Sequence, residues 1–74
     1  MKTNTIFRKF DNGDIIAIFP DEIADMNGKP LSYMHIGQHG AASPEPDNTV
    51  LATPVEYAAL KLELERIGYI LNIL

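Results

Sequence analysis

The sequence predicts a small α+β domain with a three-stranded antiparallel meander, one C-terminal helix packed on the sheet, and a final strand, in the order β-β-β-α-β. Two β-branched and aromatic runs flank an Asn-Gly pair, a helix-capping pattern begins at Thr53, and an apolar run follows Gly68. With 74 residues and no cysteine, the chain has room for one core, which no disulfide supports. We therefore expect a single domain over residues 1–74.

The first two strands are expected over residues 5–10 and 14–19, with the sequences TIFRKF and DIIAIF. Asn12 and Gly13 lie between them. An Asn-Gly pair at this place is typical of a two-residue type I′ hairpin turn, because both residues tolerate positive φ. The sequence therefore predicts a hairpin at the N-terminus.

The two-residue turn also predicts which side chains share a face of the sheet. It places Phe10 opposite Ile15 and Arg8 opposite Ala17. We expect the helix to cover one face of the sheet, and we call the other face the open face. The third strand is expected to add two side chains to the open face. The side chains expected on the open face are Arg8, Phe10, Phe19, Tyr33 and His35. Aromatic side chains beside an arginine are typical of interaction hot spots.

The middle of the chain carries weaker signals. Residues 20–30 contain acids, Asn-Gly and two prolines, and we expect a connection there, in which Ile23, Ala24 and Met26 are compatible with one helical turn. The third strand is expected over residues 31–36. Residues 37–53 are rich in Gly, Pro, Ser and Ala and predict a long loop, which is unusual in so small a domain. In that loop, Val50-Leu51 either pins the chain to the core or forms a brief extra strand.

The helix has the strongest signals. Thr53, Pro54 and Glu56 supply an N-cap hydroxyl, a proline at the first helical position and the glutamate of a capping box, and Gly68 ends the helix. Residues 69–74 then predict a final strand. Because the helix reverses the chain direction once, that strand pairs in parallel with the first or the third strand. We favour the place beside the first, which gives the spatial order 4-1-2-3.

At 100° per residue the helix has two apolar stripes instead of one. The first stripe consists of Tyr57, Leu60, Leu64 and Ile67. The second lies on nearly the opposite side and consists of Val55, Ala58, Ala59 and Leu62. A helix that covers a sheet needs one stripe, so the second is expected to meet the long loop or another copy of the protein.

The segment with the most distinctive composition, SYMHIGQHG, contains both histidines, His35 and His39, with Gly37 and Gly40 beside them, which would let the backbone approach a ligand closely. Two imidazoles four residues apart are candidates for a shared metal ion or ligand, with Glu45 or Asp47 as a third group. The alternative is that His35 is a half-buried strand residue and His39 a loop residue bonded to the backbone. No nucleophile or substrate pocket is indicated, so we expect no enzymatic activity and no cofactor.

Charge and targeting signals exclude further classes. The net charge of −4 and the pI near 4.9 disfavour a nucleic-acid partner, which calls for a basic patch. No apolar run is long enough for a signal peptide or a membrane span. We therefore expect a cytoplasmic protein with no membrane partner.

Three segments carry a resemblance: IFRKFDNGDIIAIFP, LSYMHIGQHGAA and ATPVEYAALKLELERIGYIL. They resemble a group of small uncharacterised bacterial and phage-associated proteins with similar I-F-R-K-F, S-Y-M-H-x-G-Q-H-G and T-P-x-E-Y-x-x-L segments. The resemblance covers most of the chain and implies a bacterial or mobile-element origin. It implies no activity and assigns no functional residue.

These observations favour a small accessory protein that acts through protein–protein interaction as a homodimer or with another protein. The predicted interaction residues come from the open face and the second helix stripe: Arg8, Phe10, Phe19, Tyr33, Val55, Ala59 and Leu62. The alternative function is a small ligand- or metal-binding module built on His35, His39 and the loop after them.

Overall fold

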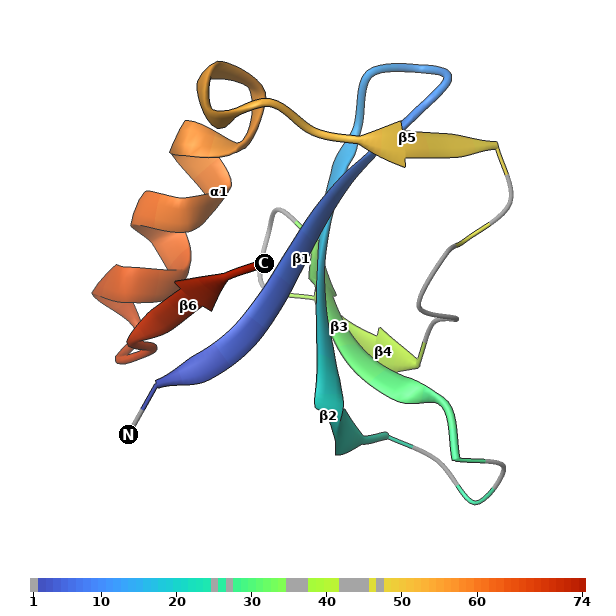
Figure 1. Ribbon diagram of the computed structural model, residues 1–74, viewed down its shortest axis with the longest axis vertical. Helices are drawn as coiled ribbons and strands as arrows, with labels where there is room; N and C mark the ends of the chain where they lie inside the picture. The colour runs from blue at the N-terminus through green and yellow to red at the C-terminus, as the bar shows by residue number, and fades with distance from the viewer. Residues whose placement is uncertain (1, 25, 27, 35–37, 42–45, 47) are drawn as a thin grey trace.

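The computed structural model describes residues 2–24, 26, 28–34, 38–41, 46 and 48–74. In this part of the chain, one helix follows five strands and precedes a sixth (Figure 1). The elements are β1 (Thr3–Phe10), β2 (Ile15–Ile23), β3 (Pro30–Met34), β4 (Gln38–Ala41), β5 (Thr49–Leu51), α1 (Pro54–Arg66) and β6 (Leu71–Ile73). The α+β class, the helix and the final strand are confirmed.

All the strands belong to one sheet, in which β1 has a central place. The path runs β4-β3-β2-β1-β5, and β6 also pairs with β1. Strands β1 to β4 form an antiparallel meander, while β6 runs parallel to β1. The outer edge of β1 therefore carries β6 along its first half and β5 along its second. The predicted place of the last strand beside the first is confirmed.

Strands β4 and β5 lie in the segment that was predicted as a loop, so the order β-β-β-α-β is incomplete. They span four and three residues, too few for an alternating pattern to stand out in the sequence. For Val50-Leu51 the extra-strand alternative holds. The two side chains are 58% and 63% exposed, so they do not pin the segment to the core.

The β1–β2 hairpin turns over three residues, and the predicted type I′ turn is wrong. The Phe10 N–H donates to the Asp14 carbonyl at 2.8 Å, and the Gly13 N–H donates to the Phe10 carbonyl at 2.9 Å. Gly13 has φ +92°, whereas Asn12 keeps a negative φ. The Asn12 Oδ1 accepts the Asp14 N–H at 3.0 Å, a side-chain bond that favours a type I turn closed by glycine.

The extra turn residue shifts the register by one and so exchanges the faces of one strand relative to the other. Arg8 lies opposite Ile16 instead of Ala17. Phe19 and Tyr33 lie on the helix side, where they are 0% and 3% exposed. Their expected position on the open face is therefore wrong, while Arg8 lies on that face as predicted.

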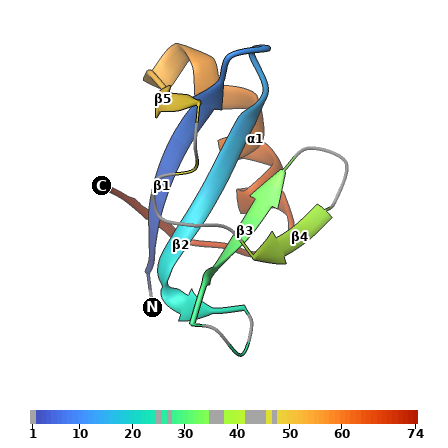
Figure 2. The ribbon, with the colours of Figure 1, turned by 90° about the vertical axis from the view of Figure 1, so that its right-hand side faces the viewer.

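The main core fills the space between the sheet and α1, which lies behind the strands in Figure 2. Tyr57 of the helix stacks on Phe7 with ring centroids 4.3 Å apart, and Tyr69 stacks on Phe19 at 5.0 Å. The buried residues of this core are Phe7, Ile15, Ala17, Phe19, Tyr33, Leu60 and Leu64. Burial, together with the Glu22 carboxylate, raises the pKa of the Tyr69 phenol.

The open face is not a bare apolar surface. Ile16 and Ile18 point away from the helix, and yet they are only 4% and 0% exposed. Strand β2 also continues through Pro20 to Ile23 with a register shift after Phe19, so the helical turn considered at Ile23 is wrong. The centre of the sheet therefore leaves little apolar surface uncovered.

Candidate functional site

The start of α1 is anchored to the sheet by its predicted capping box. The Thr53 Oγ1 accepts the Glu56 N–H at 3.4 Å, and the Glu56 Oε1 accepts the Thr53 N–H at 2.8 Å. The other Glu56 oxygen accepts a hydrogen bond from the Lys9 ammonium of β1. This bond and the Thr53 N–H lower the pKa of Glu56 to about 2. The contact fixes which helix side faces the sheet.

The inner side of α1 packs on the sheet along most of its length. Leu60 and Leu64 are 0% exposed, as the first predicted stripe requires. The Tyr33 hydroxyl of β3 donates to the Glu63 Oε2 at 2.5 Å and fixes the helix against the sheet a second time. Ile67, at the end of the stripe, is 52% exposed and lies outside the buried set.

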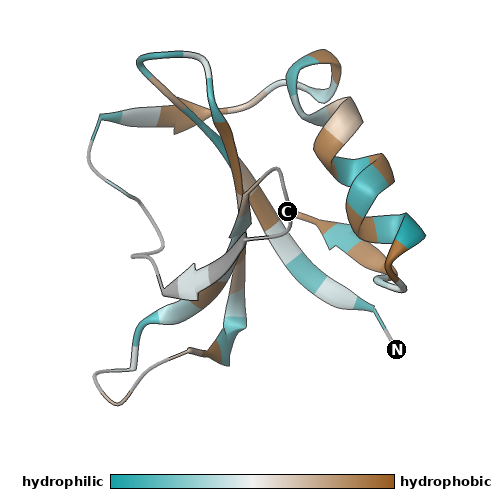
Figure 3. Ribbon diagram, turned by 180° about the vertical axis from the view of Figure 1, so that it is seen from behind, coloured by the Kyte–Doolittle hydropathy of each residue, from teal (hydrophilic) through white to brown (hydrophobic). Residues whose placement is uncertain are grey.

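The outer side of α1 carries the second predicted stripe. Val55 is 88% exposed and Leu62 is 59% exposed, and Ala58 and Ala59 between them are exposed as well. We call these four residues the outer helix face. In Figure 3, hydrophobic colour recurs among the hydrophilic residues along α1. The described residues of the chain thus leave this face uncovered.

The predicted interaction residues fall into three separate places. Val55, Ala59 and Leu62 lie on the outer helix face, and Phe19 and Tyr33 lie in the core. The remaining two, Arg8 and Phe10, lie on the opposite side of the sheet from α1. The structure therefore does not bring the predicted set together as one surface.

Arg8 is already engaged within the chain. Its Nε donates to the Thr49 Oγ1 at 2.8 Å, and a second guanidinium nitrogen donates to the Thr49 carbonyl at 3.0 Å. The Thr49 hydroxyl in turn donates to the Pro46 carbonyl at 2.6 Å. Arg8 thus joins β1 to β5, a structural role that the sequence does not predict.

His35 lies outside the described residues, as does the side chain of His39. The proposed histidine site stays a prediction for this reason. Among the side chains that the structure does describe, no group of three or more His, Cys, Asp or Glu is arranged to hold a metal ion.

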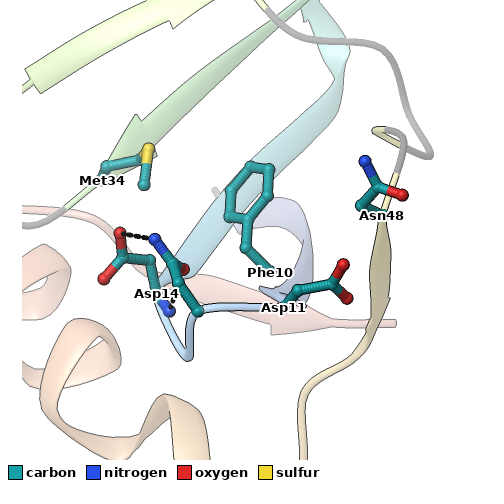
Figure 4. A pocket seen from close by; sticks show the side chains of 6 residues that line it. Phe10, Asp11, Asp14, Met34 and Asn48 are labelled. Atoms are coloured by element: carbon teal, nitrogen blue, oxygen red, sulfur yellow. Dashed lines mark hydrogen bonds between the residues drawn. The ribbon is translucent and has the colours of Figure 1, made fainter.

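A concave region at the turn end of the β1–β2 hairpin was not predicted. We call it the hairpin hollow; it has a volume of about 510 Å³. Its described lining residues are Phe10, Asp11, Asn12, Asp14, Met34 and Asn48 (Figure 4). Of these residues the sequence predicts only Phe10 as a candidate, because the hollow depends on the three-residue turn and on Asn48, which has φ +62° beside β5. The aspartates of DNGD were the available sequence signal.

In the part of the chain that the structure describes, no helix has the length and apolar composition of a transmembrane segment. No family model matches the chain, and the comparisons with curated proteins and with solved structures find no match either. The candidate functions below are therefore argued from the residues of this chain alone.

Proposed function

We propose that the protein is a cytoplasmic homodimer that acts through protein–protein interaction, with the outer helix face as the contact between the two copies. The observation that supports this proposal is the exposure of Val55 and Leu62, at 88% and 59%, on a helix whose other leucines are buried. Contiguous apolar side chains on a surface are typical of interaction sites.

The pattern along the outer helix face is suited to a second copy of the same helix. Val55 and Leu62 stand at equal distances on either side of the Ala58-Ala59 pair. A two-fold axis through that pair would therefore place Val55 of each antiparallel helix opposite Leu62 of the other. Small residues at the crossing let two helix backbones approach closely, so the large side chains interdigitate around them.

The expected gain fits a reversible dimer. Burying a valine or leucine side chain completely stabilises by about 1.5–3 kcal/mol, and each copy contributes one of each from surfaces that are already partly covered. Association also costs translational and rotational freedom, which offsets much of this gain. We therefore expect a dimer that dissociates on dilution.

The test is the solution mass of two matched variants. Leu62 and Leu51 are similarly exposed, at 59% and 63%, but Leu51 lies on β5, beside Arg8 and away from α1. Leu62→Glu is expected to reduce the dimer to a monomer in sedimentation equilibrium, while Leu51→Glu keeps the dimer. A wild-type protein that is monomeric at millimolar concentration, or equal masses for both variants, would overturn the proposal.

A further inference from the structure

The hairpin hollow has a lining that suits one kind of chemical group. Phe10 supplies a half-buried ring and Met34 a thioether, while Asp11 and Asp14 supply carboxylates. In Figure 4 the Phe10 ring stands between Met34 and Asn48, with one aspartate toward each side of it. A flat face of an aromatic ring with carboxylates beside it is a favourable environment for a planar cation.

The two carboxylates of the hollow, those of Asp11 and Asp14, form no ion pair with the described residues. Asp14 accepts a hydrogen bond from the Asn12 amide at 3.1 Å. The cation of β1 on this face, Arg8, keeps its charge and forms its hydrogen bonds with the neutral Thr49 groups, with no bond to Asp11 or Asp14 among the described residues. Lys9 lies on the opposite face with Glu56. The hollow is thus an acidic, partly apolar concavity in a chain of net charge −4.

We propose that the hairpin hollow binds an arginine side chain of a partner protein. The guanidinium would stack on Phe10 and donate to the Asp11 or Asp14 carboxylate, a pairing that a planar fork of donors makes better than an ammonium does. The aliphatic stem would lie along Met34. The hollow is a shallow depression open to solvent, and its volume of about 510 Å³ has room for this side chain.

This proposal is independent of the homodimer. The hollow lies on the side of the sheet away from α1, so a contact through the outer helix face leaves it accessible. Dimerisation is tested by mass and the hollow by titration of a small probe, so either proposal can fail alone.

The test is an NMR titration of the ¹⁵N-labelled protein with N-acetyl-arginine-N-methylamide. The matched probe is the citrulline analogue, which has the same shape and no charge, and agmatine supplies a guanidinium without a peptide backbone. We expect saturable shifts of the amides of residues 10–14 with the arginine probe and at least tenfold weaker binding of the citrulline probe. Weaker binding of agmatine than of the arginine probe supports a protein partner over a free guanidinium metabolite.

Variants locate the binding. Asp11→Asn is expected to weaken the arginine probe about tenfold, and Phe10→Leu several-fold. Glu65→Gln removes one acidic charge from the helix, where Glu65 bonds Lys61 at 3.1 Å, and is expected to leave the titration unchanged. The proposal would be overturned by equal binding of the arginine and citrulline probes or by tighter binding of agmatine. It would also be overturned if the amides shift with added calcium chloride and not with the arginine probe, or if Glu65→Gln weakens binding as much as Asp11→Asn does.

Discussion

Two leucines on α1 give the sharpest test of how the helix is placed. Leu64 is 0% exposed in the core, while Leu62, two residues earlier, is 59% exposed on the outer helix face. Leu64→Ala removes a buried side chain and leaves a cavity, at a cost of about 3 kcal/mol within the usual range of 2–5 kcal/mol. Leu62→Ala removes atoms that lie largely in water and costs about 0.5 kcal/mol or less.

The difference in stability loss between Leu64→Ala and Leu62→Ala is large for a chain of 74 residues, whose free energy of unfolding is expected to be about 4–11 kcal/mol. At about 4–8 °C per kcal/mol, Leu64→Ala should lower the Tm by about 12–24 °C. Circular dichroism in urea and on heating measures both variants, at several protein concentrations so that any dimer contribution of Leu62 is separated. Equal losses for the two variants in dilute solution would refute this placement of the helix.

The remaining predictions concern the hairpin turn at Gly13, the capping residue Glu56 and the hydrogen bond from Tyr33 to the helix. Gly13→Ala forces a residue with a side chain to φ +92° and should cost about 1–2 kcal/mol. Gly40→Ala should be nearly neutral in urea unfolding, because its φ is ordinary and, its two chain neighbours aside, no atom of the described residues lies within 4 Å of the added carbon. The lowered pKa of Glu56 means that its carboxylate stabilises the fold fully above about pH 5 and loses this effect as the pH falls toward about 2. Glu56→Gln should therefore have a lower free energy of unfolding than wild type at pH 7, and this difference should become smaller at pH 2.5. A difference in the free energy of urea unfolding that stays constant from pH 7 to pH 2.5 would contradict the Lys9–Glu56 contact. Tyr33→Phe removes the hydrogen bond to Glu63 and should lower the free energy of unfolding by about 1–2 kcal/mol, measured by thermal unfolding. An unchanged free energy of unfolding would show that this hydrogen bond is absent in solution.

Local chemistry explains why the helix could be predicted in detail. The capping box at Thr53 and Glu56 and the buried pair Leu60 and Leu64 follow from residues within a few positions of one another. Chain reversal by one helix limits β6 to a parallel place beside the first or the third strand, and the place beside β1 is the one that lets the loop and the helix cross the sheet. These features need no knowledge of distant contacts.

The candidate site was less predictable because one residue in a turn decides the faces of the sheet. Asn12-Gly13 is compatible with both a two- and a three-residue turn, and the choice depends on the Asn12 side chain bonding the Asp14 N–H. A two-residue turn would place Phe19 and Tyr33 on the open face, whereas the three-residue turn places both in the core. The hairpin hollow also needs Asn48, which is distant in sequence and reaches the hairpin only through the pairing of β5 with β1.

The most direct test of the proposed contact between two copies is cross-linking at its centre. The chain has no cysteine, so Ala59→Cys introduces a single thiol beside the proposed two-fold axis. A disulfide needs Cα atoms within about 7 Å, which only a close helix pair provides. Under mild oxidation we expect Ala59→Cys to form a covalent dimer of twice the 8.2 kDa chain much faster than Leu51→Cys does. Equally slow cross-linking of both variants would contradict the contact through the outer helix face.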